Sequence, residues 1–251
     1  MSKVSLIIPI YNYASRVHRT VDEINRFCEE SDKDWEVIFV DDGSGDQTVA
    51  AVKALVKPYP YMRIVEQPGN MGKGAAVRRG LQESTGDFHI FTDCDLAYDL
   101  DQVDRILQEL EQGADLAFAD RRHPDSTCIV DDNKTEYQKK RDTMSYVLHK
   151  LVERIGLGNI RDTQAGLKGV TKEASPILSR GTINGFSFDI ELFAIARVNK
   201  LSTIPVPIRY HIEDAPSTVT PIPVALEFIQ SIRTIRKKMI RGSYDAVQHT
   251  R

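Results

Sequence analysis

The 251-residue sequence contains few cysteines and no long hydrophobic run. Its three cysteines, Cys28, Cys94 and Cys128, lie far apart, which argues against a disulfide framework and against a zinc knuckle. No uncharged apolar stretch approaches the roughly 18–20 residues that span a bilayer. The first residues lead straight into a strand-like segment and lack the long apolar region of a signal peptide. We therefore expect a reduced, cytoplasmic protein without membrane-spanning helices.

The sequence also has no large excess of charge of either sign. It holds 33 Lys and Arg against 36 Asp and Glu, a formal net charge of −3. This balance argues against a chain that coats nucleic acid, so no nucleic-acid partner is expected. A hydrophobic fraction of 41% and a charged fraction of 27% are ordinary for a globular protein and argue against disorder.

Apolar segments of strand length alternate with helical patterns through the first half of the chain. Strands are expected at residues 4–10, 35–40, 63–65, 88–92 and 115–119, whose apolar runs suit burial on both faces. Helices are expected at residues 17–27, 49–56, 74–83 and 101–111, where apolar residues recur at helical spacing. This order predicts an α/β fold with a Rossmann-like, mostly parallel sheet and helices on both faces.

The second half of the chain is less regular. Residues 120–132 are polar and contain Pro124, which predicts a loop. Helices are expected at residues 134–155, 172–178 and 188–199, with strands at residues 166–170 and 203–206. Prolines then predict a loop before a last helix at residues 225–241. We expect one domain over residues 1–220, followed by a C-terminal amphipathic helix and tail over residues 221–251.

Polar and acidic residues follow three of the predicted strands at their carboxyl ends, where ligands bind in an open parallel sheet. They are Pro9, Tyr11 and Asn12 after the first strand, Asp41 and Asp42 after the second, and Asp93 and Asp95 after the fourth. Asp93 and Asp95 can hold one Mg²⁺ or Mn²⁺ ion, whose other ligands are commonly water and phosphate. The alternatives are a solvated turn at residues 93–95 and a helix-capping turn at residues 41–46.

A glycine-rich loop and three arginines complete the candidate site. Residues 70–74 (NMGKG) precede a helix, so their N–H groups can approach a phosphate while Lys73 offsets its charge. The spacing is not that of a P-loop, and no G-x-G-x-x-G follows the first strand, which argues against a dehydrogenase. Arg121, Arg122 and Arg141 can hold a phosphate, although charged runs are usually solvated.

Four of these segments together resemble the family-two glycosyltransferases of GT-A fold in order and spacing. They are residues 4–12 (VSLIIPIYN), 40–44 (VDDGS), 70–74 (NMGKG) and 93–95 (DCD). Residues 161–169 (RDTQAGLKG) and 185–192 (GFSFDIEL) are similar to the dolichyl-phosphate glucosyltransferase and mannosyltransferase branch. The resemblance runs from residue 4 to about residue 236.

The resemblance implies an inverting, metal-dependent transfer of a hexose from a UDP- or GDP-sugar to a polyprenyl phosphate. The residues that it implies for the donor are Pro9, Tyr11, Asn12, Asp41, Asp42, Lys73 and Gln164. Asp93 and Asp95 would hold Mg²⁺ or Mn²⁺ against the diphosphate, and Asp95 would also count as catalytic. Arg121 and Arg141 would bind the acceptor phosphate, with Arg121 also catalytic. Asp189 stands where relatives with hydroxyl acceptors have a base.

Two residues depart from the family pattern. Tyr13 replaces the glutamate that often follows Tyr-Asn, and Asp120 replaces the serine before Arg121. The altered residue before Arg121 and the lack of a predicted membrane-spanning helix favour one alternative, which keeps the donor but uses a soluble or glycan hydroxyl acceptor, as in polysaccharide or glycoconjugate synthesis. A nucleotidyltransferase is disfavoured because no basic glycine-rich loop follows the first strand. A non-catalytic binding module is disfavoured because both acidic motifs are intact.

The last predicted helix combines an apolar stripe with positive charge. The stripe is formed by Phe228, Ile229, Ile232, Ile235 and Met239. The basic residues are Arg233, Arg236, Lys237, Lys238 and Arg241, against one acid, Glu227. Either the stripe packs on the domain and the charges face water, or the helix lies on an anionic membrane surface. The second reading predicts peripheral contact with the cytoplasmic face of a membrane.

Overall fold

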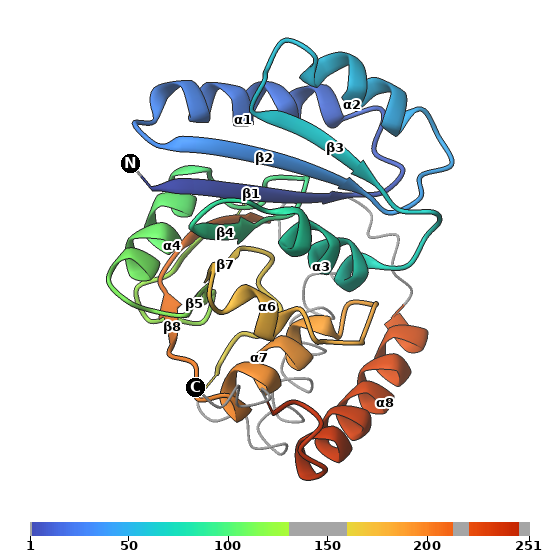
Figure 1. The fold of residues 1–251 in the computed structure, drawn as a ribbon, viewed down its shortest axis with the longest axis vertical. Helices are drawn as coiled ribbons and strands as arrows, with labels where there is room; N and C mark the ends of the chain where they lie inside the picture. The colour runs from blue at the N-terminus through green and yellow to red at the C-terminus, as the bar shows by residue number, and fades with distance from the viewer. Residues whose placement is uncertain (1, 131–159, 213–220, 246–251) are drawn as a thin grey trace.

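The computed structural model describes residues 2–130, 160–212 and 221–245, which build an α/β fold around a seven-stranded sheet (Figure 1). The strands lie in the order β3-β2-β1-β4-β7-β5-β8. Their bounds are β1 Lys3–Ile10, β2 Asp34–Asp41, β3 Met62–Glu66, β4 Phe88–Phe91, β5 Leu116–Ala119, β7 Lys168–Thr171 and β8 Thr203–Val206. Strand β7 runs antiparallel to both of its neighbours, and the other pairs are parallel.

Helices cover both faces of this sheet (Figure 1). One face packs against α1 (Val17–Glu30), α2 (Thr48–Val56) and α4 (Asp101–Glu111). The other packs against α3 (Lys73–Glu83), α6 (Ser175–Leu178) and α7 (Phe188–Val198), and α8 (Pro221–Ile240) packs on α7. The predicted mostly parallel sheet with helices on both faces is therefore confirmed.

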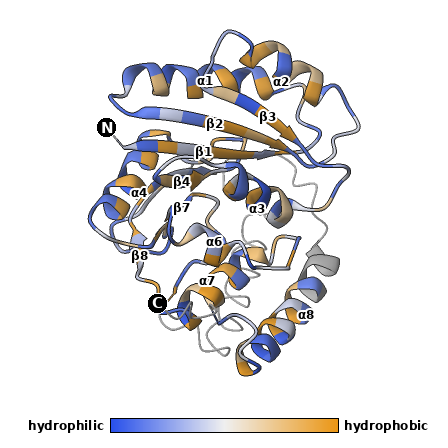
Figure 2. Ribbon diagram, viewed as in Figure 1, coloured by the Kyte–Doolittle hydropathy of each residue, from blue (hydrophilic) through white to orange (hydrophobic). Residues whose placement is uncertain are grey.

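The central strands are apolar because each faces two cores. In β1, Leu6 and Ile8 belong to the core beneath α1, whereas Ile7 belongs to the core beneath α3. The same alternation holds in β2, where Phe39 and Val40 point to opposite faces. Figure 2 shows this concentration of hydrophobic residues in the strands. The cores fix the register of the sheet, and with it the edge at which the strand ends meet.

Several expectations for the second half are corrected. Residues 120–132 include a strand, β6 (Thr127–Val130), which pairs in parallel with β9 (Arg209–Ile212). The strand expected at residues 203–206 is confirmed as β8, which tolerates Pro205 because it is an edge strand. Helix α8 begins at Pro221, four residues before the expected start, since proline suits a first helical turn. The helix expected at residues 134–155 lies outside the described residues.

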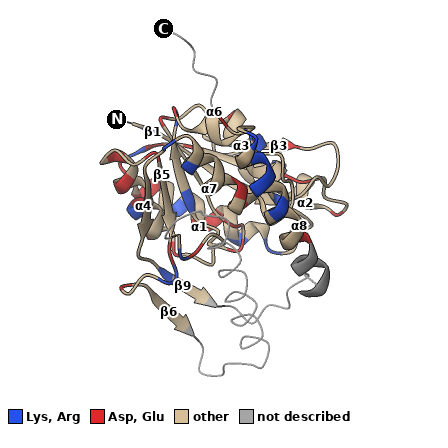
Figure 3. Cartoon of the chain, turned by 90° about the horizontal axis from the view of Figure 1, so that it is seen from below, with Lys and Arg blue, Asp and Glu red and all other residues tan. Residues whose placement is uncertain are grey.

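The β6–β9 pair projects from the main body (Figure 3) and braces the loop after β4. The N–H of His211 donates to the carbonyl oxygen of Ala97 at 2.9 Å, and Tyr98 forms an isolated bridge with Tyr210. This loop carries Asp93 and Asp95, so β9 supports the candidate metal site. Across residues 2–130, 160–212 and 221–245, no helix is both long and apolar enough to cross a membrane.

Candidate functional site

The carboxyl ends of β1 and β2 are joined by hydrogen bonds around Asn12. Its Oδ1 accepts the N–H of Gly45 at 2.8 Å, and its own N–H donates to Oγ of Ser44 at 2.8 Å. Asn12 has a φ of 48°, a conformation that asparagine adopts more readily than most residues. Pro9 is buried within β1, whereas the side chain of Tyr11 is 48% exposed. Asn12 thus shapes the loop, and the ring of Tyr11 is accessible at its surface.

Asp41 ends β2 and is almost fully buried, with 1% of its surface exposed. Its Oδ2 accepts the N–H of Gly43 at 3.0 Å and that of Ser44 at 2.9 Å. Its Oδ1 is buried and has no hydrogen-bond partner among the residues that the structure describes. A buried carboxylate oxygen without a donor is costly, so this atom fits a donor group of a ligand.

Asp42 is occupied by the glycine-rich loop. Its Oδ1 accepts the side-chain N–H of Gln67 at 2.7 Å and the N–H of Met71 at 2.8 Å, and its Oδ2 accepts the N–H of Gly72 at 2.8 Å. Gly72 has a φ of 99°, and a Cβ there would lie 2.5 Å from the carbonyl oxygen of Asn184. In the structure, Asp42 therefore positions the loop at residues 70–73. The nucleoside contact that the sequence suggested for Asp42 stays a prediction.

Asp93 follows β4 and forms an ion pair with Lys73, the first residue of α3. The backbone of Gly166 lies on the other side, where a Cβ would come within 2.1 Å of Oδ2 of Asp93. Burial alone would raise the pKa of Asp93, but Lys73, Lys168 and Arg121 outweigh burial and hold the pKa below its usual value. Asp93 is therefore ionised at neutral pH.

Asp95 lies on the exposed turn that follows. Its Oδ1 accepts the N–H of Ala97 at 3.2 Å, and Leu96 between them has a φ of 52°. The turn is anchored where the carbonyl oxygen of Cys94 accepts the hydroxyl of Thr20 at 2.8 Å. The described part of the chain contains no group of three or more His, Cys, Asp or Glu side chains arranged to hold a metal. The turn offers carboxylates, not a complete protein cage.

Arg121 is held by Asp162 through two parallel hydrogen bonds. Nε donates to Oδ2 at 2.6 Å and Nη2 donates to Oδ1 at 2.8 Å. Burial would raise the pKa of Asp162, but the guanidinium outweighs burial and lowers it. Oδ1 of Asp162 also accepts the N–H of Gln164 at 3.2 Å, and the half-buried Gln164 side chain donates to Oγ1 of Thr163 at 3.3 Å. The predicted arginine and glutamine are thus joined through one buried carboxylate.

Asp189, in the first turn of α7, is paired with Lys168 of β7. The ammonium nitrogen lies 2.6 Å from Oδ1 of Asp189 and also donates to the carbonyl oxygen of Ala165 at 2.5 Å. Lys168 is fully buried, and Asp189 is 4% exposed. The rings of Phe91 and Phe193 lie 5.6 Å and 5.8 Å from the ammonium. Burial raises the pKa of Asp189 and lowers that of Lys168.

The two departures from the family pattern have local explanations. Asp120 builds the turn after β5, because its Oδ1 accepts the N–H of Arg122 at 2.9 Å and its carbonyl oxygen accepts the hydroxyl of Ser126 at 2.6 Å. The N–H of Tyr13 donates to Oγ1 of Thr48 at 2.7 Å, which ties the loop after β1 to α2. Arg141, the second predicted acceptor arginine, lies outside the described residues.

Sequence reasoning assigned no role to Asp162, Lys168, Gly166 or Glu191. Glu191 is buried, and its Oε2 accepts the N–H groups of Thr182 and Ile183, both at 2.6 Å. Lys168 is a single charge inside an apolar run, and Glu191 shares its apolar run with Asp189 alone, a pattern that indicates buried partners. That signal was available in the sequence, although the identity of each partner was not.

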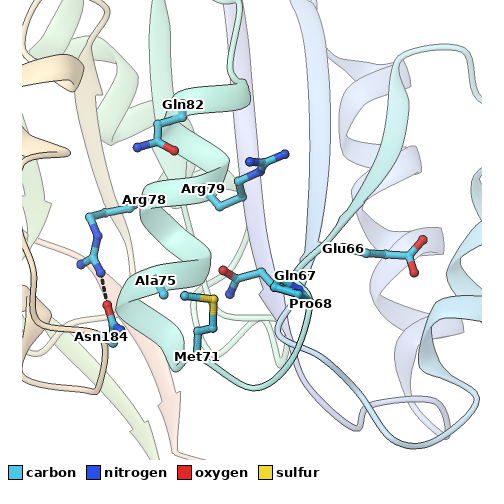
Figure 4. A pocket seen from close by; sticks show the side chains of 9 residues that line it. All are labelled: Glu66, Gln67, Pro68, Met71, Ala75, Arg78, Arg79, Gln82 and Asn184. Atoms are coloured by element: carbon cyan, nitrogen blue, oxygen red, sulfur yellow. Dashed lines mark hydrogen bonds between the residues drawn. The ribbon is translucent and has the colours of Figure 1, made fainter.

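A cavity of about 450 Å³ lies between α3 and the loop that precedes it (Figure 4). Its lining includes Met71, Arg78, Arg79 and Asn184, and none of the predicted site residues. Arg78 donates to the carbonyl oxygen of Ile183 at 2.7 Å and contacts the side chain of Asn184. The cavity adjoins Asp42 through Met71, whose N–H donates to that carboxylate, and Arg78 fastens the loop before α7.

A family model described as Glycosyl transferase family 2 matches residues 5–175. The chain is 31% identical over 216 residues to the dolichyl-phosphate beta-glucosyltransferase ALG5A of Trichomonas vaginalis, covering 81% of this chain and 64% of that protein. It is 27% identical over 259 residues to the dolichyl-phosphate beta-glucosyltransferase of Saccharomyces cerevisiae, covering 96% of this chain and 76% of that protein. The chain spans less than two thirds of the length of two Trichomonas vaginalis relatives that it matches, ALG5A and ALG5C.

Solved structures of other proteins also resemble this chain in fold. Glucosyl-3-phosphoglycerate synthase from Mycobacterium tuberculosis, in complex with UDP, has a TM-score of 0.69 at 19% identity, over 94% of this chain and 80% of that one. The same enzyme with Mn²⁺, UDP and glucosyl-3-phosphoglycerate has a TM-score of 0.62 at 19% identity, over 95% and 77% of the two chains. The expected GT-A fold is confirmed by this likeness.

Proposed function

Because this chain belongs to glycosyl transferase family 2, we propose that it moves a hexose from a nucleoside diphosphate sugar to a polyprenyl phosphate. The curated relatives are dolichyl-phosphate beta-glucosyltransferases, which favours glucose as the sugar and dolichyl phosphate or a similar lipid as the acceptor. The observation that carries the proposal is that two carboxylates, Asp41 and Asp93, lie at the same edge of the sheet. The strands that lead to them, β2 and β4, lie on either side of β1 and are about 10 Å apart at ordinary strand spacing. That span suits a nucleoside bound at one end and its diphosphate at the other.

The unpartnered Oδ1 of Asp41 supports uridine as the nucleoside. The other oxygen of this carboxylate already accepts the N–H groups of Gly43 and Ser44, so one acceptor is left for a base. Uracil presents a single ring N–H, whereas guanine presents two adjacent donors. Two structural neighbours with this fold contain UDP. The exposed ring of Tyr11 would stack on the base.

The donor set at the D-x-D turn fits Mg²⁺ or Mn²⁺. Carboxylate oxygens of Asp93 and Asp95 are hard ligands, and diphosphate oxygens and water would complete the coordination. The bound metal would offset the negative charge that develops on the leaving diphosphate. A Cβ at position 166 would press on the Asp93 carboxylate, so the glycine there supports a function for that carboxylate beyond a solvated turn.

The remaining site residues would divide between sugar and acceptor. Gln164 would donate to hydroxyls of the sugar from the segment that Asp162 orients. Arg121 would bind the acceptor phosphate with the N–H groups that Asp162 does not use, and its charge would offset repulsion between acceptor and donor. Arg141 is proposed for the same task from the sequence alone. An acceptor phosphate is anionic at neutral pH and attacks without a strong base.

The environment of Asp189 favours this phosphate acceptor over a hydroxyl. A base must reach the acceptor proton within hydrogen-bond distance. Oδ1 of Asp189 is bound to Lys168 at 2.6 Å, and the residue is 4% exposed. A proton from an acceptor hydroxyl would have to reach a carboxylate that is almost fully buried and already bound to an ammonium group. We therefore propose that Asp189 positions its neighbours and is not the base.

We also propose that the outer face of α8 contacts an anionic membrane. Phe228, Ile232 and Ile235 are buried against α7, so packing on the domain is the right interpretation for most of the apolar stripe. The outer face instead carries Ile229, 37% exposed, and Ile240, 78% exposed. The exposed basic residues beside them are Arg233, Arg236, Lys237 and Arg241. Such a face suits phosphate headgroups with shallow insertion of two aliphatic side chains.

A screen of donors tests the proposed function. The purified protein is incubated with Mn²⁺ and UDP-glucose, UDP-galactose or GDP-mannose, each with and without a polyprenyl phosphate. We expect release of UDP from UDP-glucose that rises when the lipid phosphate is added. Release that rises only with a hydroxyl acceptor would favour the soluble or glycan acceptor instead.

A further inference from the structure

Lys73 lies where a cation is expected at the D-x-D turn. Its Nζ contacts Oδ1 of Asp93, one of the two carboxylates proposed as metal ligands. A divalent ion that binds Asp93 must therefore share this carboxylate with an ammonium group or displace it. Two cations on one carboxylate repel each other, so displacement is the favoured outcome.

The backbone of Lys73 is fixed, so displacement would move only its side chain. The N–H of Gly74 donates to the carbonyl oxygen of Asn184 at 2.7 Å, and Gly72 is held by Asp42. Lys73 is also the first residue of α3, where the helix N-terminus attracts anions. A diphosphate bound there would offer the ammonium a new partner close to the old one.

Because Lys168 is the direct partner of Asp189, the side chain of Lys73 can move away without leaving that buried carboxylate unpaired. The carboxylate of Asp189 is near enough to interact electrostatically with Lys73, but its direct partner is Lys168, at 2.6 Å. When Lys73 turns away, Asp189 keeps its ion pair and Asp93 gains the metal. Neither carboxylate is left as an uncompensated buried charge, which would be strongly unfavourable.

We propose that Lys73 is a resident counter-ion, which neutralises Asp93 in the free protein and passes to the diphosphate when metal and nucleotide bind. The inference rests on the proposed function, since it takes a divalent metal and a nucleoside diphosphate as the ligands. This exchange makes the binding of the metal and of the nucleotide cooperative, in addition to any direct coordination between them. Each ligand lowers the free-energy cost of moving Lys73 that the other ligand would otherwise meet.

Binding measurements on lysine variants test the exchange without any turnover. Mn²⁺ binding is followed by the electron paramagnetic resonance of the free ion, and UDP binding by calorimetry. Without nucleotide, Lys73→Met is expected to bind Mn²⁺ about tenfold more tightly than the wild type, because one charge-assisted contact no longer competes. Without metal, the same variant is expected to bind UDP about tenfold more weakly. Lys73→Arg should restore both affinities toward those of the wild type.

The matched control is Lys53→Met on α2. It removes one exposed lysine, whose Nζ lies 2.6 Å from Oε1 of Glu66. It should change neither affinity. Should Lys73→Met fail to fold, Lys73→Gln replaces it. Mn²⁺ affinity that is unchanged or lower in the Lys73 variant overturns the exchange, while binding of Mn²⁺ and UDP by the wild type leaves the proposed function standing. A wild type that binds neither ligand overturns both.

Discussion

The ammonium nitrogen of Lys168 lies 2.6 Å from Oδ1 of Asp189, and this buried ion pair joins β7 to α7 beneath the acidic strand ends. A buried pair contributes little net stability, because desolvation offsets most of the attraction. Removal of one partner is different, since it leaves the other charge buried and alone.

Lys168→Met should therefore lower the free energy of unfolding by about 3–5 kcal/mol. The double variant Lys168→Met with Asp189→Leu should recover most of that loss, because no buried charge is left. Urea unfolding of the wild type, of the single variants Lys168→Met and Asp189→Leu, and of the double variant measures both effects. Losses that simply add would mean that the two side chains do not interact in the folded protein.

The pair of Arg121 and Asp162 should make stability depend on pH in the acid range. The folded pKa of Asp162 is lowered, so its contribution is present above the unfolded pKa, about 4, and is lost as pH falls through the lower folded value. The stability difference between the wild type and Asp162→Asn should stay constant from about pH 7 to pH 5 and shrink below about pH 4. Urea unfolding at several pH values checks this, and a difference that grows on acidification would contradict it.

Arg121→Ala should weaken use of the acceptor and spare the donor. Loss of a charge-assisted contact costs about 1.5–3 kcal/mol, so the KM for polyprenyl phosphate should rise about 10- to 150-fold. The affinity for UDP should stay within about twofold of the wild type. Arg79→Ala on α3, where Arg79 pairs with Glu83, is the control and should change neither value. A loss of UDP affinity in Arg121→Ala would remove the acceptor assignment.

The outer face of α8 should bind anionic vesicles in a salt-sensitive way. Replacing Arg233, Arg236, Lys237 and Arg241 with Gln removes four charges, each worth about 1 kcal/mol near such a surface, and should abolish sedimentation with vesicles at low salt. Lys238 is left in place, because its Nζ pairs with the buried Glu191 at 3.0 Å. The control replaces four exposed basic residues elsewhere, Lys53, Lys57, Lys172 and Arg197. Equal loss in both fourfold variants would point to net charge instead of this face.

The order of strands and helices could be predicted because it depends on local patterns. The apolar runs of β1 and β2 reflect burial on both faces, and acidic residues at parallel strand ends must share an edge. The antiparallel direction of β7 and the pairing of β6 with β9 could not be predicted. These strands have four residues each, and their partners are distant in the sequence. Pro124 and the proline-rich stretch pointed away from strands that tertiary pairing nevertheless stabilises.

The residues of the candidate site could be predicted from the sequence, but their contacts could not. Asp41, Asp93 and Lys73 could be singled out because their position after a strand or before a helix already suggests a ligand. Their individual contacts could not, because they depend on loops that meet only in the fold. Asp42 is 30 residues from Gly72, and Arg121 is 41 residues from Asp162. No local pattern indicates that one aspartate holds a loop while its neighbour has a buried oxygen without a hydrogen-bond partner among the described residues.

Transfer of radiolabelled glucose from UDP-glucose to dolichyl phosphate, with Mn²⁺ and the purified chain, tests the central claim most directly. We expect a glucose-labelled lipid from the wild type, and its loss in Asp93→Asn, in Asp95→Asn and in excess chelator. Unfolding of the exposed Asp95→Asn variant should match the wild type, so that the loss reports on the site. No labelled lipid with any UDP- or GDP-hexose, or full activity of both variants in chelator, would contradict the account.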